Sequence, residues 1–243
     1  MKRKVSVAMA VYNSEKYIEQ QIDSILVQLS PEDELVISYN ISDDSTFEII
    51  SDYESRESRV KIFVCDKRGV QHNFENAILN TTGDIIFLAD HDDIWNKDKI
   101  KTVLNVFDTT NASVVMHSRI IVDRDLNYIR TINLESRDKR FLRNFVSNKF
   151  SGACMAFKRN IIKFSIPIPK KFVYHDVWIG LISSLMTNIE IINLPLNIHR
   201  RHENNASKDK HRFFAIIIIE RSVLLFLLII RAIKMVFYRD KYK

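Results

Sequence analysis

The chain has 243 residues, of which 46% are hydrophobic and 27% charged, and it contains only four glycines and four prolines. This length is enough for one sizeable domain with an appendage, and the composition excludes a disordered or fibrous protein. The two cysteines, Cys65 and Cys154, lie far apart and exclude a disulfide framework, which is typical of a protein from a reducing compartment.

The excess positive charge lies at the carboxyl end of the chain. Residues 197–243 contain 11 Lys or Arg and 4 Asp or Glu, whereas the net charge of the whole chain is only +6. The rest of the chain is therefore almost neutral. Such an asymmetry indicates that the tail, and not the main domain, meets nucleic acid or an anionic membrane surface.

Alternating strands and helices are predicted for the first half of the chain. Lys2, Arg3 and Lys4 precede an apolar run that is short for a signal peptide, so we expect this run to form the first strand. The predicted strands are residues 4–13, 33–41, 60–66 and 84–90, and the predicted helices are residues 14–28, 46–56, 69–81 and 96–109. Residues 112–123 predict one strand or a pair of strands. This order predicts an α/β fold, with a mostly parallel, doubly wound sheet and helices on both faces.

Polar residues follow three of the predicted strands. They are Tyr12 and Asn13 after the first, Asp43 and Asp44 after the second, and the sequence DHDD at residues 90–93 after the fourth. Ligands of parallel α/β sheets bind beyond the carboxyl ends of the strands, so we expect these residues to meet at one edge of the sheet. The sequence therefore predicts a ligand site at that edge.

The acidic residues at 90–93 suggest a metal site. Asp90, Asp92 and Asp93 would repel one another, and a hard divalent cation such as Mg²⁺ or Mn²⁺ would offset that repulsion. The alternative is a solvated turn whose aspartates cap the next helix. We expect Asp93 to be such a cap, and Trp95 to pack beside the site.

Two readings also apply to the other candidate residues. Asp43 and Asp44 can bind a nucleobase and ribose, or they can cap the helix that is predicted to begin near Thr46. Asp176 is expected in the first turn of a helix, where the helix dipole keeps a carboxylate ionised. It is a candidate general base, with a plain helix cap as the alternative. The segment HRRHENN at residues 199–205 offers guanidinium groups for phosphate, or it is a basic surface loop.

Seven segments, taken together and in order, resemble a known family. They are VSVAMAVYNSEKYIEQQIDSILVQ, ISDDS, GVQHNFENAI, GDIIFLADHDDIW, SGACMAFKRN, YHDVWIGL and HRRHENNAS. From about residue 4 to residue 206, the chain resembles the inverting, nucleotide-sugar-dependent glycosyltransferases of family 2, which have the GT-A fold. It looks most like the branch that includes bacterial rhamnosyltransferases of surface-polysaccharide assembly.

The resemblance implies a role for each candidate residue. The residues that would bind the nucleotide-sugar donor are Tyr12, Asn13, Asp43, Asp44, Asp90, His91 and Arg201. Among them, Asp43 would contact the nucleobase and Asp90 the ribose. Asp92 and His202 would bind Mn²⁺ or Mg²⁺ on the diphosphate, and Asp176 would be the general base. The implied reaction moves a sugar, with inversion, to a hydroxyl of a glycan or lipid-linked acceptor in bacterial surface polysaccharide synthesis.

Two departures from the family pattern bear on these roles. The family usually has a longer acidic loop of the form D-D-x-S-x-D-x-T, and SDDSTFEII lacks several of its residues. Arg201 stands where related sequences often have Gln. A non-catalytic glycan- or nucleotide-binding protein with a decayed site is therefore an alternative. A nucleotidyltransferase is another, although it would normally need a glycine-rich phosphate loop and VYNSEKY contains no glycine.

The end of the chain is expected to be a distinct basic and apolar segment. We expect a GT-A domain at residues 1–206 and an amphipathic helical tail at residues 207–243. Glu220 and Arg221 interrupt its long apolar run, which favours helices lying on an anionic cytoplasmic leaflet over a spanning helix. Helix packing or a homodimer through the tail is the third alternative. The long apolar runs argue against nucleic acid as a partner. Since an anionic membrane surface is the favoured partner of the tail, we expect a cytoplasmic protein at the inner face of the plasma membrane.

Overall fold

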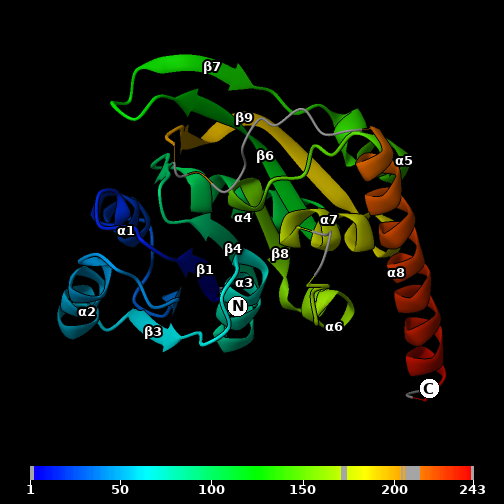
Figure 1. Ribbon diagram of the computed structural model, residues 1–243, viewed down its shortest axis with the longest axis horizontal. Coiled ribbons are helices and arrows are strands. Elements are labelled where there is room, and N and C mark those ends of the chain that lie inside the picture. Colours follow the sequence, from blue (N-terminus) through cyan, green and yellow to red (C-terminus); the bar gives the residue numbers. More distant parts are fainter. Residues whose placement is uncertain (1–2, 171–173, 204, 206–213, 242–243) are drawn as a thin grey trace.

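The computed structural model describes residues 3–170, 174–203, 205 and 214–241 (Figure 1). Among these residues, nine strands form one mixed sheet in the order β3-β2-β1-β4-β8-β6-β9-β5, and β7 pairs with β6. The first half of the chain consists of β1 (Val5–Val11), α1 (Ile18–Leu26), β2 (Glu34–Tyr39), α2 (Thr46–Arg56), β3 (Val60–Val64), α3 (Val70–Asn80) and β4 (Ile85–Asp90). Its four strands pair in parallel, which confirms the predicted alternation of strands and helices.

The second half extends the sheet with mixed pairing. Its strands are β5 (Ile94–Trp95), β6 (Val114–Val122), β7 (Tyr128–Ile132), β8 (Met155–Lys158) and β9 (Ile189–Arg200). Its helices are α4 (Lys99–Thr109), η1 (Ser136–Lys139), α5 (Phe141–Val146), η2 (Gly152–Cys154), η3 (Arg159–Ile161), α6 (Ile162–Ser165), α7 (His175–Met186) and α8 (Phe214–Lys241). Strand β8 lies antiparallel between β4 and β6, whereas β9 runs parallel to β6. The predicted strand at 112–123 is thus β6, with β7 as its hairpin partner.

Helices cover both faces of the sheet because its inner strands are apolar on both sides. In β1, Val7 and Met9 belong to a core cluster with residues of α1, α2 and α4. Ala8 and Ala10, which point to the other face, belong to a second cluster with residues of α3, α7 and α8. Near-continuous apolar strands of this kind are typical of parallel sheets that are buried on both faces. The fold is therefore doubly wound, as predicted.

Helix α8 packs against the domain along one side and is exposed along the other (Figure 1). Leu224 and Leu228 are buried in the second core cluster, and Arg231 donates hydrogen bonds to the carbonyl oxygens of Ile166 and Pro167 at 2.7 and 2.6 Å. Its exposed apolar residues are Ile218, Ile219, Leu225, Phe226, Ile229 and Ile233. Among the described residues, no helix combines the length and the hydropathy that are needed to cross a bilayer. Residues 207–213, which begin the predicted tail, lie outside the described residues.

Because of Glu34, the stability of the sheet is expected to fall as the pH is lowered into the acid range. Its side chain is 2% exposed and accepts hydrogen bonds from Ser6 Oγ at 2.6 Å, Thr82 Oγ1 at 2.8 Å and Lys61 Nζ at 2.7 Å. Burial by itself raises the pKa of Glu34, but these hydrogen bonds outweigh burial and lower the pKa to about 2. Since the pKa of Glu34 is lower in the folded state, its stabilising effect is complete above the ordinary pKa and is lost as the pH falls towards 2.

We therefore expect Glu34→Gln to lower the free energy of unfolding by about 2 kcal/mol at neutral pH, because hydrogen bonds to a buried charge are lost. The variant should also lose less stability than the wild type when the pH is lowered below about 4. Urea denaturation at several pH values measures both effects. Glu48→Gln, at an exposed position of α2, is the matched control. Equal pH dependence in the wild type and Glu34→Gln would contradict this role of Glu34.

Candidate active site

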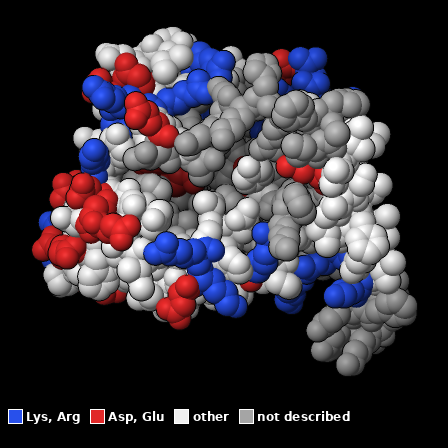
Figure 2. All heavy atoms as spheres, in the orientation of Figure 1, with Lys and Arg blue, Asp and Glu red and all other residues white. Residues whose placement is uncertain are grey.

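A cavity of about 1860 Å³ opens where the carboxyl ends of β1, β2 and β4 meet. The predicted site residues that line it are Tyr12, Asn13, Asp44, Asp90, His91, Asp92, Asp176, Arg201 and His202. Figure 2 shows the surface hollowed on this face, with acidic atoms in the depth of the hollow. The parallel sheet therefore brings residues from widely separated parts of the sequence to one edge, as expected for this fold.

Asp43 and Asp44 have different surroundings. Asp43 is exposed and does not line the cavity, although its backbone N–H donates to Asn13 Oδ1 at 3.0 Å. Asp44 accepts hydrogen bonds from the backbone N–H groups of Thr46 at 3.1 Å and Glu15 at 3.2 Å. The N-cap residue of α2 is Ser45, which makes no side-chain capping hydrogen bond, so the reading of Asp44 as the cap is wrong. Asp44 instead accepts from the first helical N–H, and it also lines the cavity. The assignment of Asp43 to a nucleobase stays a prediction.

Asp90 ends β4 in an environment that disfavours its charge. Burial, together with the charges of Asp93 and Asp92, raises the pKa of Asp90 to about 8. The loop is held in place by backbone contacts, since Gln21 Nε2 donates to the Asp90 carbonyl oxygen at 2.7 Å and His91 Nδ1 lies 3.1 Å from the Ala10 carbonyl oxygen. The negative charges of Asp92 and Asp93 disfavour a further charge on Asp90, and a cation bound beside these carboxylates would offset that repulsion.

Asp92 is paired with the segment at residues 199–205. Its Oδ2 accepts hydrogen bonds from His202 Nε2 at 2.9 Å and from Asn205 Nδ2 at 3.0 Å. Burial raises the pKa of Asp92, but the charges of His91 and His202 and the hydrogen bond from His202 outweigh burial and lower the pKa to about 2. Asp92 and His202, which were predicted as metal ligands, are therefore neighbours in the cavity wall. Carboxylate oxygen and imidazole nitrogen are a suitable pair for Mn²⁺.

Asp93 does not cap the following helix, so that prediction is wrong. Its side chain is completely buried and accepts hydrogen bonds from Asn197 Nδ2 at 2.6 Å, His199 Nδ1 at 2.9 Å and the Arg200 backbone N–H at 3.3 Å. These partners lie more than a hundred residues away in the sequence, which local capping patterns cannot reveal. Trp95, in contrast, packs in the core, although it does not line the cavity.

A second group of possible metal ligands overlaps the first. Ligand atoms of Asp90, Asp93 and His199 lie within 4.8 Å of one another. Asp93, however, does not line the cavity, and both its oxygens already accept hydrogen bonds. Asp92, His199 and His202 do line the cavity. Asp92 Oδ2 and His202 Nε2 are likewise hydrogen-bonded to each other, so hydrogen bonding does not separate the two groups, and the assignment of a cation to Asp92 and His202 stays a prediction.

Asp176 lies in the first turn of α7, as predicted, and lines the cavity. Its Oδ1 accepts a hydrogen bond from the Val177 backbone N–H at 2.7 Å. The helix is anchored by Trp178, whose Nε1 donates to the Ser165 carbonyl oxygen at 2.7 Å, and by close packing of Gly180 on Phe150. A rigid helix thus holds the carboxylate at the cavity.

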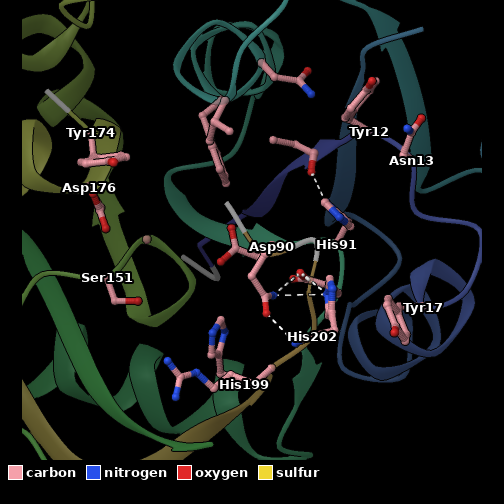
Figure 3. Close-up of a pocket in the computed structure, with 18 of the residues that line it drawn as sticks. Tyr12, Asn13, Tyr17, Asp90, His91, Ser151, Tyr174, Asp176, His199 and His202 are labelled. Carbon is pink, nitrogen blue, oxygen red and sulfur yellow. Dashed lines mark hydrogen bonds and ion pairs between the residues drawn. The ribbon is translucent and has the colours of Figure 1, made fainter. Parts of the chain in front are cut away.

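Figure 3 shows how these groups surround the cavity. Asp90 lies near the centre of the view. Asp176, Tyr174 and Ser151 lie on one side of it, and His91, His202 and Tyr17 lie on the other. His199 lies below Asp90, close to the residues that hold the acidic loop. The candidate base and the candidate metal ligands therefore face a common space, which is what a displacement between two bound molecules needs.

Residues that the sequence patterns did not single out also line the cavity. Arg119 comes from β6 and His199 from β9, strands whose partners are distant in sequence. His199 lies in the segment HRRHENN, so its basic composition was a partial signal. Arg119 carries no comparable signal, because a single arginine in an apolar strand is common at exposed positions. Only the sheet topology places it at the site.

Comparison with known proteins agrees with the fold. The family model described as glycosyl transferase family 2 matches residues 6–164. An uncharacterized glycosyltransferase of Nostoc is 24% identical over 203 residues, covering 76% of this chain and 63% of its own length. A dTDP-rhamnosyl transferase of Shigella flexneri is 34% identical over 111 residues, covering 43% of this chain and 38% of its own length. The chain thus spans less than two thirds of the length of these relatives.

Solved structures share the fold. S. aureus TarS 1–349 in complex with UDP-GlcNAc matches with a TM-score of 0.71 and 20% identity, over 89% of this chain and 66% of that one. A mannosyltransferase from Pyrobaculum calidifontis in complex with GDP-Man and Mn²⁺ matches with a TM-score of 0.63 and 17% identity, over 84% of this chain and 59% of that one. The family match covers more than half of the chain, so the chain belongs to glycosyltransferase family 2.

Proposed function

We propose that this chain is an inverting glycosyltransferase that moves a sugar from a nucleotide-diphosphate sugar to a hydroxyl of a glycan or lipid-linked acceptor in bacterial surface polysaccharide synthesis. The main support is that one cavity gathers a helix-anchored carboxylate, Asp176, and the acidic residues Asp90 and Asp92. The names of relatives point the same way, since one is a dTDP-rhamnosyl transferase and another a β-1,3-glucosyltransferase that acts on a lipid-linked glycan.

In the proposed reaction, Asp176 accepts the proton of the acceptor hydroxyl, whose oxygen forms the new bond to the anomeric carbon. The bond from that carbon to the diphosphate breaks on the opposite face, which inverts the anomeric configuration. Tyr12, Asn13 and Asp44 border the part of the cavity where the nucleotide would lie. Asp92 and His202 would hold Mn²⁺ or Mg²⁺, which neutralises charge on the leaving diphosphate when bound. Positioning donor and acceptor in line contributes much of the rate.

A screen of nucleotide-sugars tests this proposal. UDP-, dTDP- and GDP-sugars are titrated into the protein by calorimetry, with and without Mn²⁺, and we expect one base to bind best and to bind more tightly with the metal. Turnover of that donor in the presence of bacterial glycans or lipid-linked acceptors then follows. If no nucleotide-sugar binds, the decayed-site alternative is correct and the enzymatic proposal is wrong.

We also propose that the exposed face of α8 lies on an anionic lipid surface at the inner face of the plasma membrane. Phe226 and Ile229 are 63% and 50% exposed, and Figure 2 shows mainly uncharged atoms along this edge of the molecule. Lys234 is exposed near the end of the same helix. A helix with exposed apolar residues and nearby cations suits the interface of an anionic bilayer.

Replacing both Phe226 and Ile229 by Asp should reduce binding to vesicles of phosphatidylglycerol and phosphatidylethanolamine by about tenfold or more, because two apolar side chains are lost from the contact. Cosedimentation measures the loss. Thermal stability should be unchanged, since neither residue belongs to the core. Val27→Asp, which replaces an apolar residue that is 78% exposed on the far side of the fold, is the control. Unchanged vesicle binding would contradict the membrane role, and a change from dimer to monomer would assign this face to a second copy of the chain.

A further inference from the structure

One wall of the cavity consists of basic side chains from β6 and β9. In the parallel pairing of these strands, Arg119 is opposite Asn197 and Ile121 is opposite His199. Because side chains alternate along a strand, Arg119, Asn197 and His199 share one face of the sheet. Arg119 and His199 both line the cavity. The two basic side chains therefore form one wall, which we call the β6–β9 wall.

A buried network fixes the orientation of His199. Its Nδ1 lies 2.9 Å from Asp93 Oδ1, and Asp93 is an acceptor only, so this nitrogen carries a proton. Its Nε2 has no hydrogen bond among the described residues and is not buried from solvent. The ring nitrogen that remains available to a ligand is therefore Nε2.

The network continues to Lys99, which leaves a single arrangement for the amide of Asn197. The ammonium group of Lys99 is fully buried and donates to Asn197 Oδ1 at 3.3 Å and to the Ala153 carbonyl oxygen at 2.7 Å. Since the carboxylate of Asp93 can only accept, Asn197 must turn its Nδ2 to Asp93, which leaves its oxygen for Lys99. Lys99, Asn197 and Asp93 thus hold His199 in a fixed orientation.

The guanidinium group of Arg119 has hydrogen-bond donors without a partner among the described residues. Its Nη1 has a weak contact with Cys154 Sγ at 3.9 Å, and its Nε is buried without a hydrogen-bond partner among the described residues. A guanidinium group has five donors, and unsatisfied donors at a largely buried position are costly. Burial by itself lowers the pKa of Arg119, but nearby groups that include Asp93 and Asp176 outweigh burial and raise it, so the guanidinium lies near both carboxylates. Because Nε is buried, a ligand in the cavity would be bound by the terminal Nη groups of Arg119.

We propose that Arg119 and His199 bind the β-phosphate of the nucleoside diphosphate, and so stabilise the leaving group. This inference rests on the proposed function. It follows from the position of the β6–β9 wall beside Asp90, the end of the cavity where a diphosphate would meet a cation. It also follows from chemistry, since a guanidinium with free donors matches phosphate better than it matches an uncharged sugar ring. To donate to a phosphate oxygen, His199 must carry a proton on Nε2 as well as on Nδ1, and the adjacent Asp93 carboxylate favours this charged form.

The test compares nucleoside diphosphates with monophosphates. Calorimetry with UDP and UMP, dTDP and dTMP, and GDP and GMP first identifies the base that the wild type prefers. For that base, Arg119→Met and His199→Asn should weaken binding of the diphosphate about tenfold, the usual effect of one charge-assisted hydrogen bond. Binding of the monophosphate should change by less than about twofold. Arg119→Lys should restore part of the loss, because it returns the charge.

The variants are chosen to keep the fold intact. Asparagine places its amide nitrogen near the position of imidazole Nδ1, so His199→Asn can still donate to Asp93. Arg56→Met removes an arginine that pairs with Asp52 on the exposed surface of α2, and it is the control for loss of one positive charge. Equal losses for diphosphate and monophosphate, or unchanged diphosphate binding, would overturn the β6–β9 wall alone. Failure of the wild type to bind any of the diphosphates would overturn the proposed function together with the wall.

Discussion

Asp176→Asn should reduce sugar transfer by about 100- to 10,000-fold, because the variant lacks the group that accepts the acceptor proton. Asparagine has almost the same shape as aspartate, and its oxygen can still accept the hydrogen bond from the Val177 backbone N–H. Donor affinity should therefore change far less than the rate of transfer, since Asp176 is not among the residues proposed to bind the donor. Initial rates of transfer and calorimetric titration of the donor measure the two effects separately.

A matched control separates the loss of a base from the loss of a helix-terminal charge. Asp98 precedes the first residue of α4, is exposed, and does not line the cavity. Asp98→Asn should leave transfer unchanged, although it also removes a carboxylate from a helix terminus. Transfer by Asp176→Asn at a near-normal rate would show that another group accepts the proton.

The part of the site that follows from the sequence is the part built by local order. Strands β1, β2 and β4 are mainly apolar, and each ends in polar residues. Parallel pairing must place such ends together, so Asn13, Asp44 and Asp90 could be assigned to one edge without coordinates. Asp176 could be placed in the first turn of a helix for the same reason, because the apolar residues after it have helical spacing.

The part that did not follow depends on pairing between distant segments. Strand β8 inserts antiparallel between β4 and β6, and β9 joins β6 from more than seventy residues further along the chain. These pairings bury Asp93 against Asn197 and bring Arg119 to the cavity. A local pattern therefore suggested a helix cap for Asp93, whereas the tertiary structure makes it the anchor of His199.

Helix α8 illustrates a second limit of sequence patterns. Apolar residues occur around most of its circumference, so the sequence does not distinguish the face that packs on the domain from the face that is exposed. The structure assigns Leu224 and Leu228 to the core and leaves Phe226 and Ile229 exposed. The position of Arg231 over the ring of Trp178, at 5.4 Å, fixes this rotation of the helix. The membrane proposal consequently concerns one face of α8 and not the whole tail.

Asp92→Asn should reduce metal-dependent transfer by about 100-fold or more, since a divalent cation contributes several kcal/mol of charge stabilisation in such sites. Asparagine can still accept the hydrogen bond from Asn205, so the loop should keep its shape. The measurement is nucleotide affinity with and without Mn²⁺, followed by transfer rates in EDTA and after Mn²⁺ is returned. The wild type should lose transfer in EDTA and regain it, whereas the variant should gain little from Mn²⁺.

Asp93→Asn is the variant that decides between the two groups of possible ligands. An amide at position 93 would turn a donor towards Asn197 Nδ2 or His199 Nδ1, leaving one buried donor unsatisfied. It should therefore lower the free energy of unfolding by about 1–3 kcal/mol, while the effect of Mn²⁺ on nucleotide affinity persists in the folded protein. If Asp93→Asn abolishes the effect of Mn²⁺ and Asp92→Asn does not, the cation is held by Asp90, Asp93 and His199. In that case His199 Nε2 is a metal ligand, and Arg119 remains the member of the β6–β9 wall that can reach a phosphate.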